Sequence, residues 1–331
     1  MSLMQSANKE KIARLAALTL VLSYAELLIP RVIPFFRLGL GNAALLMGLT
    51  TGLSFPAFML LSVVKSVCAN LMAGTLFSPF FLVSFCQSVS SAFVMFVLYK
   101  ISSAGKNPLR LFGLYGVSVA GSAVSAVVQI FLSSLYLGQG TYSLLGPMLL
   151  FNLVSGVITA FIAEKYNARV FEEDSIMRVS ERTSSGGGCP CNALHRVLLL
   201  FILLVASASV FIIKNVYVLI AYLIIALTAQ KISRRKIFIV PHLSLWIFVI
   251  ITSLLVPEGR VLFSVFRFSV TQGALISGIQ KALRLSIVSA FSQCAVCIRP
   301  KENTLLALTI DYYKSMSDSL RNTKLGNKFI K

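Results

Sequence analysis

Residues 55–73 read FPAFMLLSVVKSVCANLMA, and this run decides the fold class. An α-helix of about 20 mainly apolar residues spans the hydrocarbon core of a bilayer, and this run is close to that length. Its only charged residue, Lys65, stands near the middle. A charge at that depth is costly unless it is paired or hydrated, so such residues are functional candidates. The run therefore predicts a transmembrane helix that carries a candidate site.

Similar apolar runs fill most of the chain. Hydrophobic residues make up 57% of the 331 residues and charged residues 12%, whereas a soluble domain has roughly 25% charged residues. The sequence predicts an all-α polytopic membrane protein with about ten transmembrane helices, the first retained because no signal-peptidase-like site follows it. Besides 55–73, the expected spans are 12–29, 38–54, 79–99, 112–137, 145–164, 197–213, 215–229, 237–256 and about 271–298.

A polar stretch divides these spans into two groups. Residues 165–193 contain the sequence Thr183-Ser-Ser-Gly-Gly-Gly-Cys-Pro-Cys191, and small, polar, glycine-rich segments are typical of flexible linkers. We therefore expect a six-helix bundle in residues 1–164, a cytoplasmic linker in 165–193, and a four-helix bundle with a C-terminal amphipathic helix in 194–331.

The net charge of +19 indicates orientation. Most of the 30 Lys and Arg residues lie between apolar runs, in segments that share one side if the N-terminus is inside. Cytoplasmic loops carry such an excess of basic residues. The pattern predicts cytoplasmic termini, a multi-pass protein of the cytoplasmic (inner) membrane surrounded by the lipid bilayer, and no binding to nucleic acid.

The few titratable residues make an enzyme a poor prediction. The chain has 11 Asp and Glu residues and 2 His residues, yet acid–base and metal sites draw on these types. It contains no Asp-Asp-x-x-Asp motif and no phosphate-binding G-x-x-x-x-G-K-[ST] loop. The pairs Cys189/Cys191 and Cys294/Cys297 have unfavourable spacing or position for zinc. We expect no catalytic residue, no metal and no cofactor.

Polar residues within or beside the first six spans form the candidate substrate-binding set. A positive charge such as Lys65 could pair with an anionic ligand group, with Glu26, or reach the membrane surface. The amides could line a ligand cavity or bond neighbouring helices. The candidates are Lys65, Glu26, Arg37, Asn42, Asn70, Gln87, Gln129 and Asn152.

The first half resembles a known family. The motifs that carry the resemblance are Glu26-x-x-Ile-Pro30, Arg37-Leu-Gly-Leu-Gly-Asn42, Lys65, Gly74-Thr-Leu-Phe-Ser-Pro79, Gly116-Val-Ser-Val-Ala-Gly121 and Gln129. Over about residues 12–164 they are similar to heptaprenyl diphosphate synthase component I, also called the Gx transporter family. That family commonly has Arg at the position of Lys65, and His-Asn at Ser125-Ala126. The resemblance implies the fold of the substrate-binding S components of energy-coupling factor (ECF) transporters, and its name implies a prenyl diphosphate synthase partner.

The second half has a weaker resemblance. Arg234-Arg-Lys236, Gly273-Ala-Leu-x-x-Gly278 and Ala282-Leu-Arg-Leu285 are similar to the scaffold T component of ECF transporters, over residues 194–320. This resemblance implies partner ATPase subunits supplied in trans, although the ATPase-coupling motif of T components is not evident.

The last segment has an amphipathic stripe. Apolar residues recur at spacings of three or four, which is typical of a helix with one apolar face. The stripe could pack on its own bundle or dock on a partner. It consists of Leu305, Leu308, Tyr312, Met316 and Leu320.

Three functions follow as expectations. The first is a transport protein that fuses an S-like and a truncated T-like component and imports a small, anionic substrate. The second is a membrane accessory subunit of heptaprenyl (polyprenyl) diphosphate synthesis, acting with a soluble catalytic partner. The third is a membrane scaffold without transport.

Overall fold

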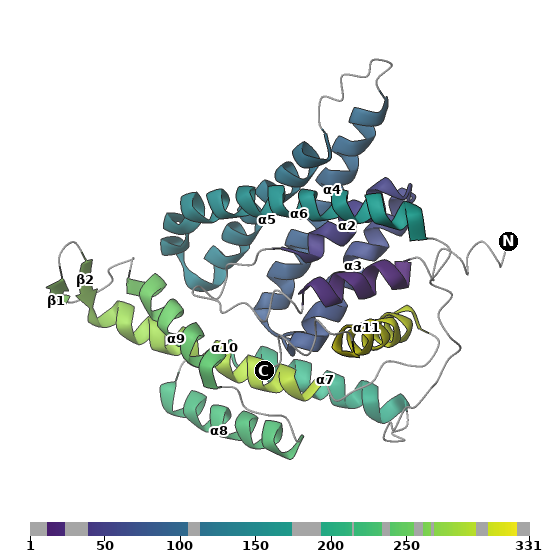
Figure 1. The fold of residues 1–331 in the computed structure, drawn as a ribbon. Coiled ribbons are helices and arrows are strands. Elements are labelled where there is room, and N and C mark those ends of the chain that lie inside the picture. The colour runs from purple at the N-terminus through teal and green to yellow at the C-terminus, as the bar shows by residue number, and fades with distance from the viewer. Residues whose placement is uncertain are drawn as a thin grey trace.

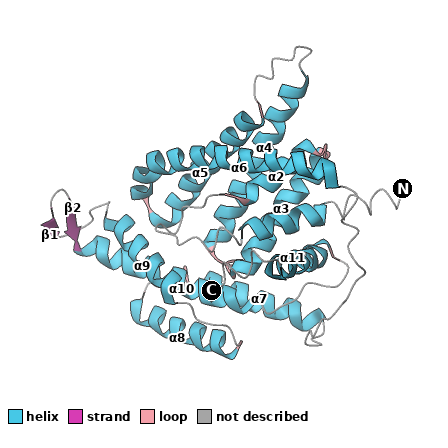
Figure 2. Ribbon diagram, viewed as in Figure 1, coloured by secondary structure: helices cyan, strands magenta, loops and turns pink. Residues whose placement is uncertain are grey.

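The computed structural model describes residues 12–23, 39–104, 113–173, 193–213, 215–233, 239–254, 261–265, 268–295 and 304–322. Across these ranges the chain is helical apart from one hairpin (Figure 2). A helix at Ile12–Ser23 precedes α2 (Gly41–Thr50), α3 (Phe55–Ala73), α4 (Pro79–Ala104), α5 (Leu114–Leu137), the 3-10 helix η1 (Gln139–Leu144) and α6 (Leu145–Glu173). Then come α7 (Ala193–Ser209), α8 (Val216–Ile232), α9 (Ile239–Leu254), the antiparallel strands β1 (Val261–Val265) and β2 (Phe268–Thr271), α10 (Gln272–Ala295) and α11 (Leu305–Asn322).

Several of the helices are long and apolar enough to cross a membrane. Over the described residues these are Phe55–Met72, Pro79–Ser102, Leu114–Leu137, Gln139–Tyr166 and Gln272–Cys294. They confirm a helical, multi-pass membrane protein. The helices at Ile12–Ser23, Val216–Ile232 and Leu245–Leu254 are apolar but shorter, and α2 has only 10 residues. The count of ten spans and the orientation of the termini therefore stay predictions.

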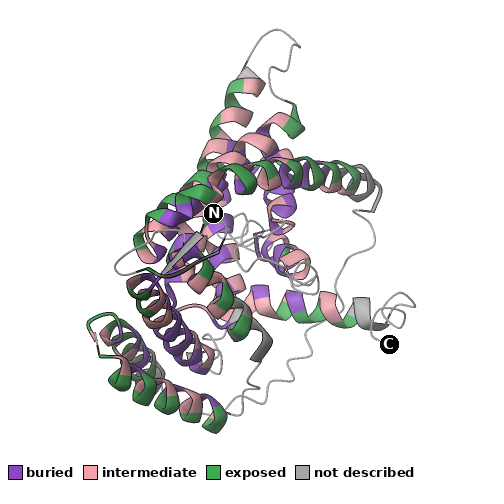
Figure 3. Cartoon of the chain, turned by 90° about the vertical axis from the view of Figure 1, so that its left-hand side faces the viewer, coloured by how far each residue is buried: buried purple, intermediate pink, exposed green. Residues whose placement is uncertain are grey.

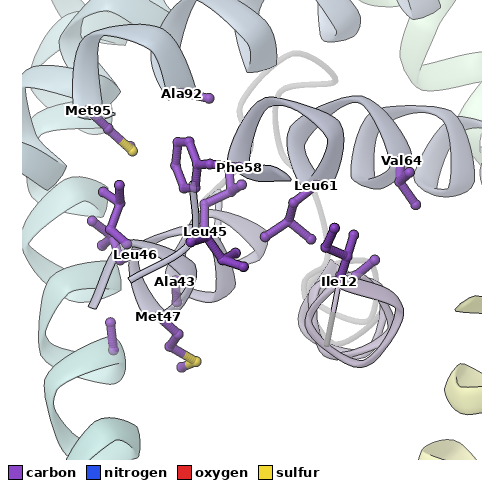
Figure 4. Close-up of a cluster of buried hydrophobic side chains, with 14 of the residues drawn as sticks. Ile12, Ala43, Leu45, Leu46, Met47, Phe58, Leu61, Val64, Ala92 and Met95 are labelled. Atoms are coloured by element: carbon purple, nitrogen blue, oxygen red, sulfur yellow. The ribbon is translucent and has the colours of Figure 1, made fainter. Parts of the chain in front are cut away.

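The N-terminal bundle is formed by the helix at 12–23 and by α2 to α6. Its core is apolar: Phe58 and Leu61 of α3, Leu45 and Leu46 of α2, and Met95 of α4 are fully buried there (Figure 4). Small residues bring the helices of this bundle close together, as is usual in membrane proteins. Ser118 of α5 donates a 2.7 Å hydrogen bond to the carbonyl of Gly156 in α6.

The C-terminal bundle is built around α10. This helix packs against α7, α8 and α9, and its residues Leu283, Ile287, Val288 and Phe291 belong to the core of the bundle. The indole N–H of Trp246 in α9 donates a 2.8 Å hydrogen bond to the hydroxyl of Ser286. The surface of this bundle has apolar, exposed side chains: Ile212, Tyr217 and Ile232 are each 82% exposed. Exposed residues cover much of the outer helices (Figure 3), which suits a lipid environment.

The helix α11 leaves the C-terminal bundle and returns to the N-terminal one. Figure 1 shows α11, at the yellow end of the colour range, beside the purple N-terminal helices. Tyr313 is part of the N-terminal core, and Leu305, Leu306, Tyr312 and Met316 pack against it. The guanidinium of Arg14 lies 5.7 Å from the ring centre of Tyr312, a cation–π distance. Residues from opposite ends of the chain thus complete one core.

Candidate functional site

Lys65 and Asn42 meet inside the N-terminal bundle. The ammonium group of Lys65, in the middle of α3, donates a hydrogen bond to the side-chain oxygen of Asn42 in the first turn of α2. Both residues are half-buried. Two of the predicted site residues, 23 positions apart in sequence, are therefore brought into direct contact.

A glycine allows a third element to approach this pair. A Cβ atom at Gly41 would lie 2.7 Å from the hydroxyl of Ser23, 3.1 Å from Cγ2 of Thr19 and 3.4 Å from Cε of Lys65. Glycine leaves the space that this close approach needs. Ser23 and Thr19 were missed by the sequence analysis, although Gly41, next to a candidate amide, could have indicated a crowded position.

The turn before α2 extends the polar cluster to α6. Gly39 has a φ of +65°, a conformation that favours glycine, and its carbonyl accepts a 2.7 Å hydrogen bond from the backbone N–H of Asn42. A Cβ at Gly39 would lie 3.7 Å from the hydroxyl of Ser155 in α6. The ammonium group of Lys65, the amide of Asn42 and the hydroxyls of Ser23 and Ser155 thus lie around the start of α2. We call these four residues, together with Gly41, the Lys65 cluster.

Asn70 has a different environment. It is 1% exposed, and its side-chain N–H₂ donates to the carbonyl of Ser66 at 2.8 Å and to the hydroxyl of Ser84 at 3.2 Å. Its side-chain oxygen accepts a 2.8 Å hydrogen bond from the hydroxyl of Thr75. These bonds hold the connection between α3 and α4 in shape.

The other predicted amides lie on α4, α5 and α6. Gln87 is half-buried on α4, and Asn152 donates a 3.1 Å hydrogen bond to the carbonyl of Met148, one turn earlier in α6. Gln129 lines a small pocket together with Ser133, Thr141 and Phe248. That pocket includes no residue of the Lys65 cluster. The predicted residues Glu26 and Arg37 lie outside the described residues.

The described pockets are small. A second one lies between α4, α5 and α10 and is lined by Phe80, Ser133, Tyr136 and Leu285 among others. Each of the two has a cavity volume of about 10 Å³, far below the roughly 300–1,000 Å³ of ligand pockets. Within the described ranges, no group of three or more His, Cys, Asp and Glu residues could hold a metal ion.

The predicted docking stripe on α11 is largely covered by the chain itself. Leu305, Tyr312 and Met316 pack against the N-terminal core, and Leu308 is half-buried. The side chain of Leu320 lies outside the described residues. The structure therefore places this stripe against its own N-terminal bundle, and docking on a further partner stays a prediction.

Comparisons with known proteins divide the chain between residues 166 and 193, the segment that separates the two bundles. Residues 193–294 match a family described as a domain of unknown function, DUF8519. No curated protein and no solved structure matches the chain. Residues 15–166 match a second family, and this match confirms the resemblance expected from the sequence motifs. The N-terminal bundle is similar to heptaprenyl diphosphate synthase component I.

Proposed function

We propose that this chain is a multi-pass transport protein of the cytoplasmic membrane, in which residues 12–164 bind a small anionic substrate and residues 194–320 support that unit. The proposal extends the two family resemblances, to an S component and a truncated T component of an ECF transporter. In that mechanism the binding unit changes its orientation in the membrane while the scaffold turns. Both termini would be cytoplasmic, and ATPase subunits would be supplied in trans.

The Lys65 cluster is the observation that carries the proposal. Lys65 brings a positively charged ammonium group to this cluster, and that group donates a hydrogen bond to the side-chain oxygen of Asn42. The pair stands at the N-terminus of α2, where the helix dipole adds partial positive charge. Hydroxyls from two further helices lie beside it. Together these groups favour an anionic ligand group over a neutral one.

Native mass spectrometry of the purified protein tests this function. We expect a small anionic molecule to be retained by the wild type and by Lys65→Arg, which keeps the charge, and to be lost from Lys65→Ala. Lys100→Ala is the matched control, because Lys100 is exposed at the end of α4. Retention of the molecule by Lys65→Ala at the wild-type level would show that the Lys65 cluster is not the binding site.

A second function is favoured by the family match of residues 15–166. The chain would be a membrane accessory subunit of heptaprenyl diphosphate synthesis, and a separate soluble subunit would supply the catalytic aspartates. Co-purification from the native membrane separates the two functions. An ATPase pair supports transport, whereas a soluble prenyl diphosphate synthase supports the accessory role.

A further inference from the structure

The connection between α3 and α4 and the first two residues of α4, together residues 74–80, pack against the C-terminal bundle. We call this segment the 74–80 connection. The backbone N–H of Phe77 donates a 3.0 Å hydrogen bond to the hydroxyl of Ser292 in α10. The side chain of Phe77 packs against the core that contains Leu283 and Ile287. Phe80 packs against a second cluster, where Leu137 of α5 meets Ala282 and Leu285 of α10. Two aromatic side chains of one bundle thus contribute to the packing of the other.

The shape of this connection fits α10 closely. Gly74 ends α3 with a φ of +66°, and a Cβ there would lie 2.3 Å from the side-chain amide of Gln293. The side chain of Gln293 therefore occupies space that only glycine leaves open. The bonds from Thr75 to Asn70 keep the connection folded against α3. The surface is preorganised, which lowers the entropy lost when it meets a partner.

The two bundles also correspond to two separate families. One family match ends at residue 166 and the other begins at residue 193, so the junction seen here joins units that are matched independently. Each unit has its own apolar core, as expected of units that fold separately.

We propose that the region similar to DUF8519 is a membrane partner domain for the component I-like bundle, and that its helix α10 recognises the 74–80 connection without needing the covalent linker. The proposal deepens the supporting role given to residues 194–320 in the proposed function. Its test measures association, so it can succeed or fail whether or not a substrate is found.

The experiment cleaves the intact, purified protein after it has folded. A protease site is inserted near Gly187, between the bundles, and another near Lys301, between α10 and α11, because α11 also contacts the N-terminal bundle. After cleavage in detergent, size-exclusion chromatography shows whether the fragment that contains α10 elutes with the N-terminal fragment. We expect the two fragments of the wild type to elute together.

Three variants locate the contact. Phe77→Ala should reduce the co-eluting fraction at least several-fold, whereas Phe131→Ala, which removes an equal side chain that is 57% exposed on α5, should leave it unchanged. Ser292→Val should also reduce it, because it leaves the N–H of Phe77 without its acceptor, and it serves if Phe77→Ala does not fold. Separation of the wild-type fragments, or co-elution of the Phe77→Ala and Ser292→Val fragments at the wild-type level, would overturn the proposal.

Discussion

The ammonium group of Lys281, in α10, donates a 2.9 Å hydrogen bond to the backbone carbonyl of Leu137, the last residue of α5. One turn further along α10, the guanidinium of Arg284 donates a 2.8 Å hydrogen bond to the carbonyl of Ile213, beyond the end of α7. The last carbonyls of a helix lack partners within it and carry partial negative charge. Each cation therefore stabilises the chain at or just beyond a helix end. The contact of Lys281 with Leu137 also joins the two bundles.

These contacts change the electrostatic argument for an anionic substrate. Like Lys65, both Lys281 and Arg284 fall within an apolar run that was expected to span the membrane. In the structure, both Lys281 and Arg284 donate hydrogen bonds to backbone carbonyls. The expectation of an anionic ligand therefore depends on Lys65.

Replacing Lys281 with Met should destabilise the protein, because the variant keeps an apolar side chain but cannot donate to Leu137. Hydrogen bonds from charged groups contribute about 1.5–3 kcal/mol, so we expect a loss of that size in the free energy of unfolding. Thermal melting in detergent measures it. Lys231→Met is the control, since Lys231 is exposed in the last turn of α8. Equal melting of the two variants would contradict a structural role for Lys281.

The contact between α5 and α6 predicts opposite effects of alanine at two glycines of α6. A Cβ at Gly156 would lie 2.8 Å from the hydroxyl of Ser122 and 3.0 Å from the backbone Cα of Val119, whereas a Cβ at Gly146 meets nothing within 4 Å. Gly156→Ala should therefore cost about 1–3 kcal/mol through overpacking. Gly146→Ala should be neutral or stabilising by up to about 1 kcal/mol. The melting temperatures of the two variants, compared with that of the wild type, test whether α5 packs too closely against Gly156 to admit a Cβ atom.

The return of α11 predicts a strong effect at Tyr313. This residue is 9% exposed in the N-terminal core, so Tyr313→Ala should lower the free energy of unfolding by about 3 kcal/mol, as other large aromatic deletions do. Tyr217→Ala removes the same side chain from a position that is 82% exposed and should have little effect. Melting curves of the two variants that coincide would show that α11 does not pack on the bundle in solution.

The predicted topology can be tested with a reporter fused after Ser185, in the segment between the bundles. An even number of spans before that point places the reporter in the cytoplasm, as the excess of basic residues also predicts. We expect a reporter that is active only in the cytoplasm to be active when it is fused at this site. Activity of an export-dependent reporter at the same site would overturn the ten-span arrangement.

Local patterns were sufficient to predict the long helices. The span expected at 55–73 has the same bounds as α3, and the span expected at 112–137 begins two residues before α5. Apolar runs of this length determine helices without help from distant residues. The contact of Lys65 with Asn42 was not predicted: both were candidate site residues, but the partners considered for Lys65 were an anionic ligand group and Glu26.

The contacts between distant segments could not be predicted. The hydrogen bond of Phe77 to Ser292 joins residues 215 positions apart. Phe77 lies in the motif Gly74-Thr-Leu-Phe-Ser-Pro79, but that motif does not indicate which distant segment it contacts. The stripe on α11 did predict an amphipathic helix, but its periodicity carries no information about which surface would cover it. Such choices depend on tertiary packing.

The position of α11 also bears on the order of events during synthesis. Domains generally fold from the N-terminus as the chain emerges, at about 5–20 residues per second. The helix at 12–23 and α3 therefore enter the membrane well before Tyr313 is made. Their shared core stays open on one side until the C-terminal bundle has been inserted and α11 follows it. In a chain interrupted after α10, the part of that apolar core covered by Tyr313 and its neighbours on α11 would therefore stay exposed.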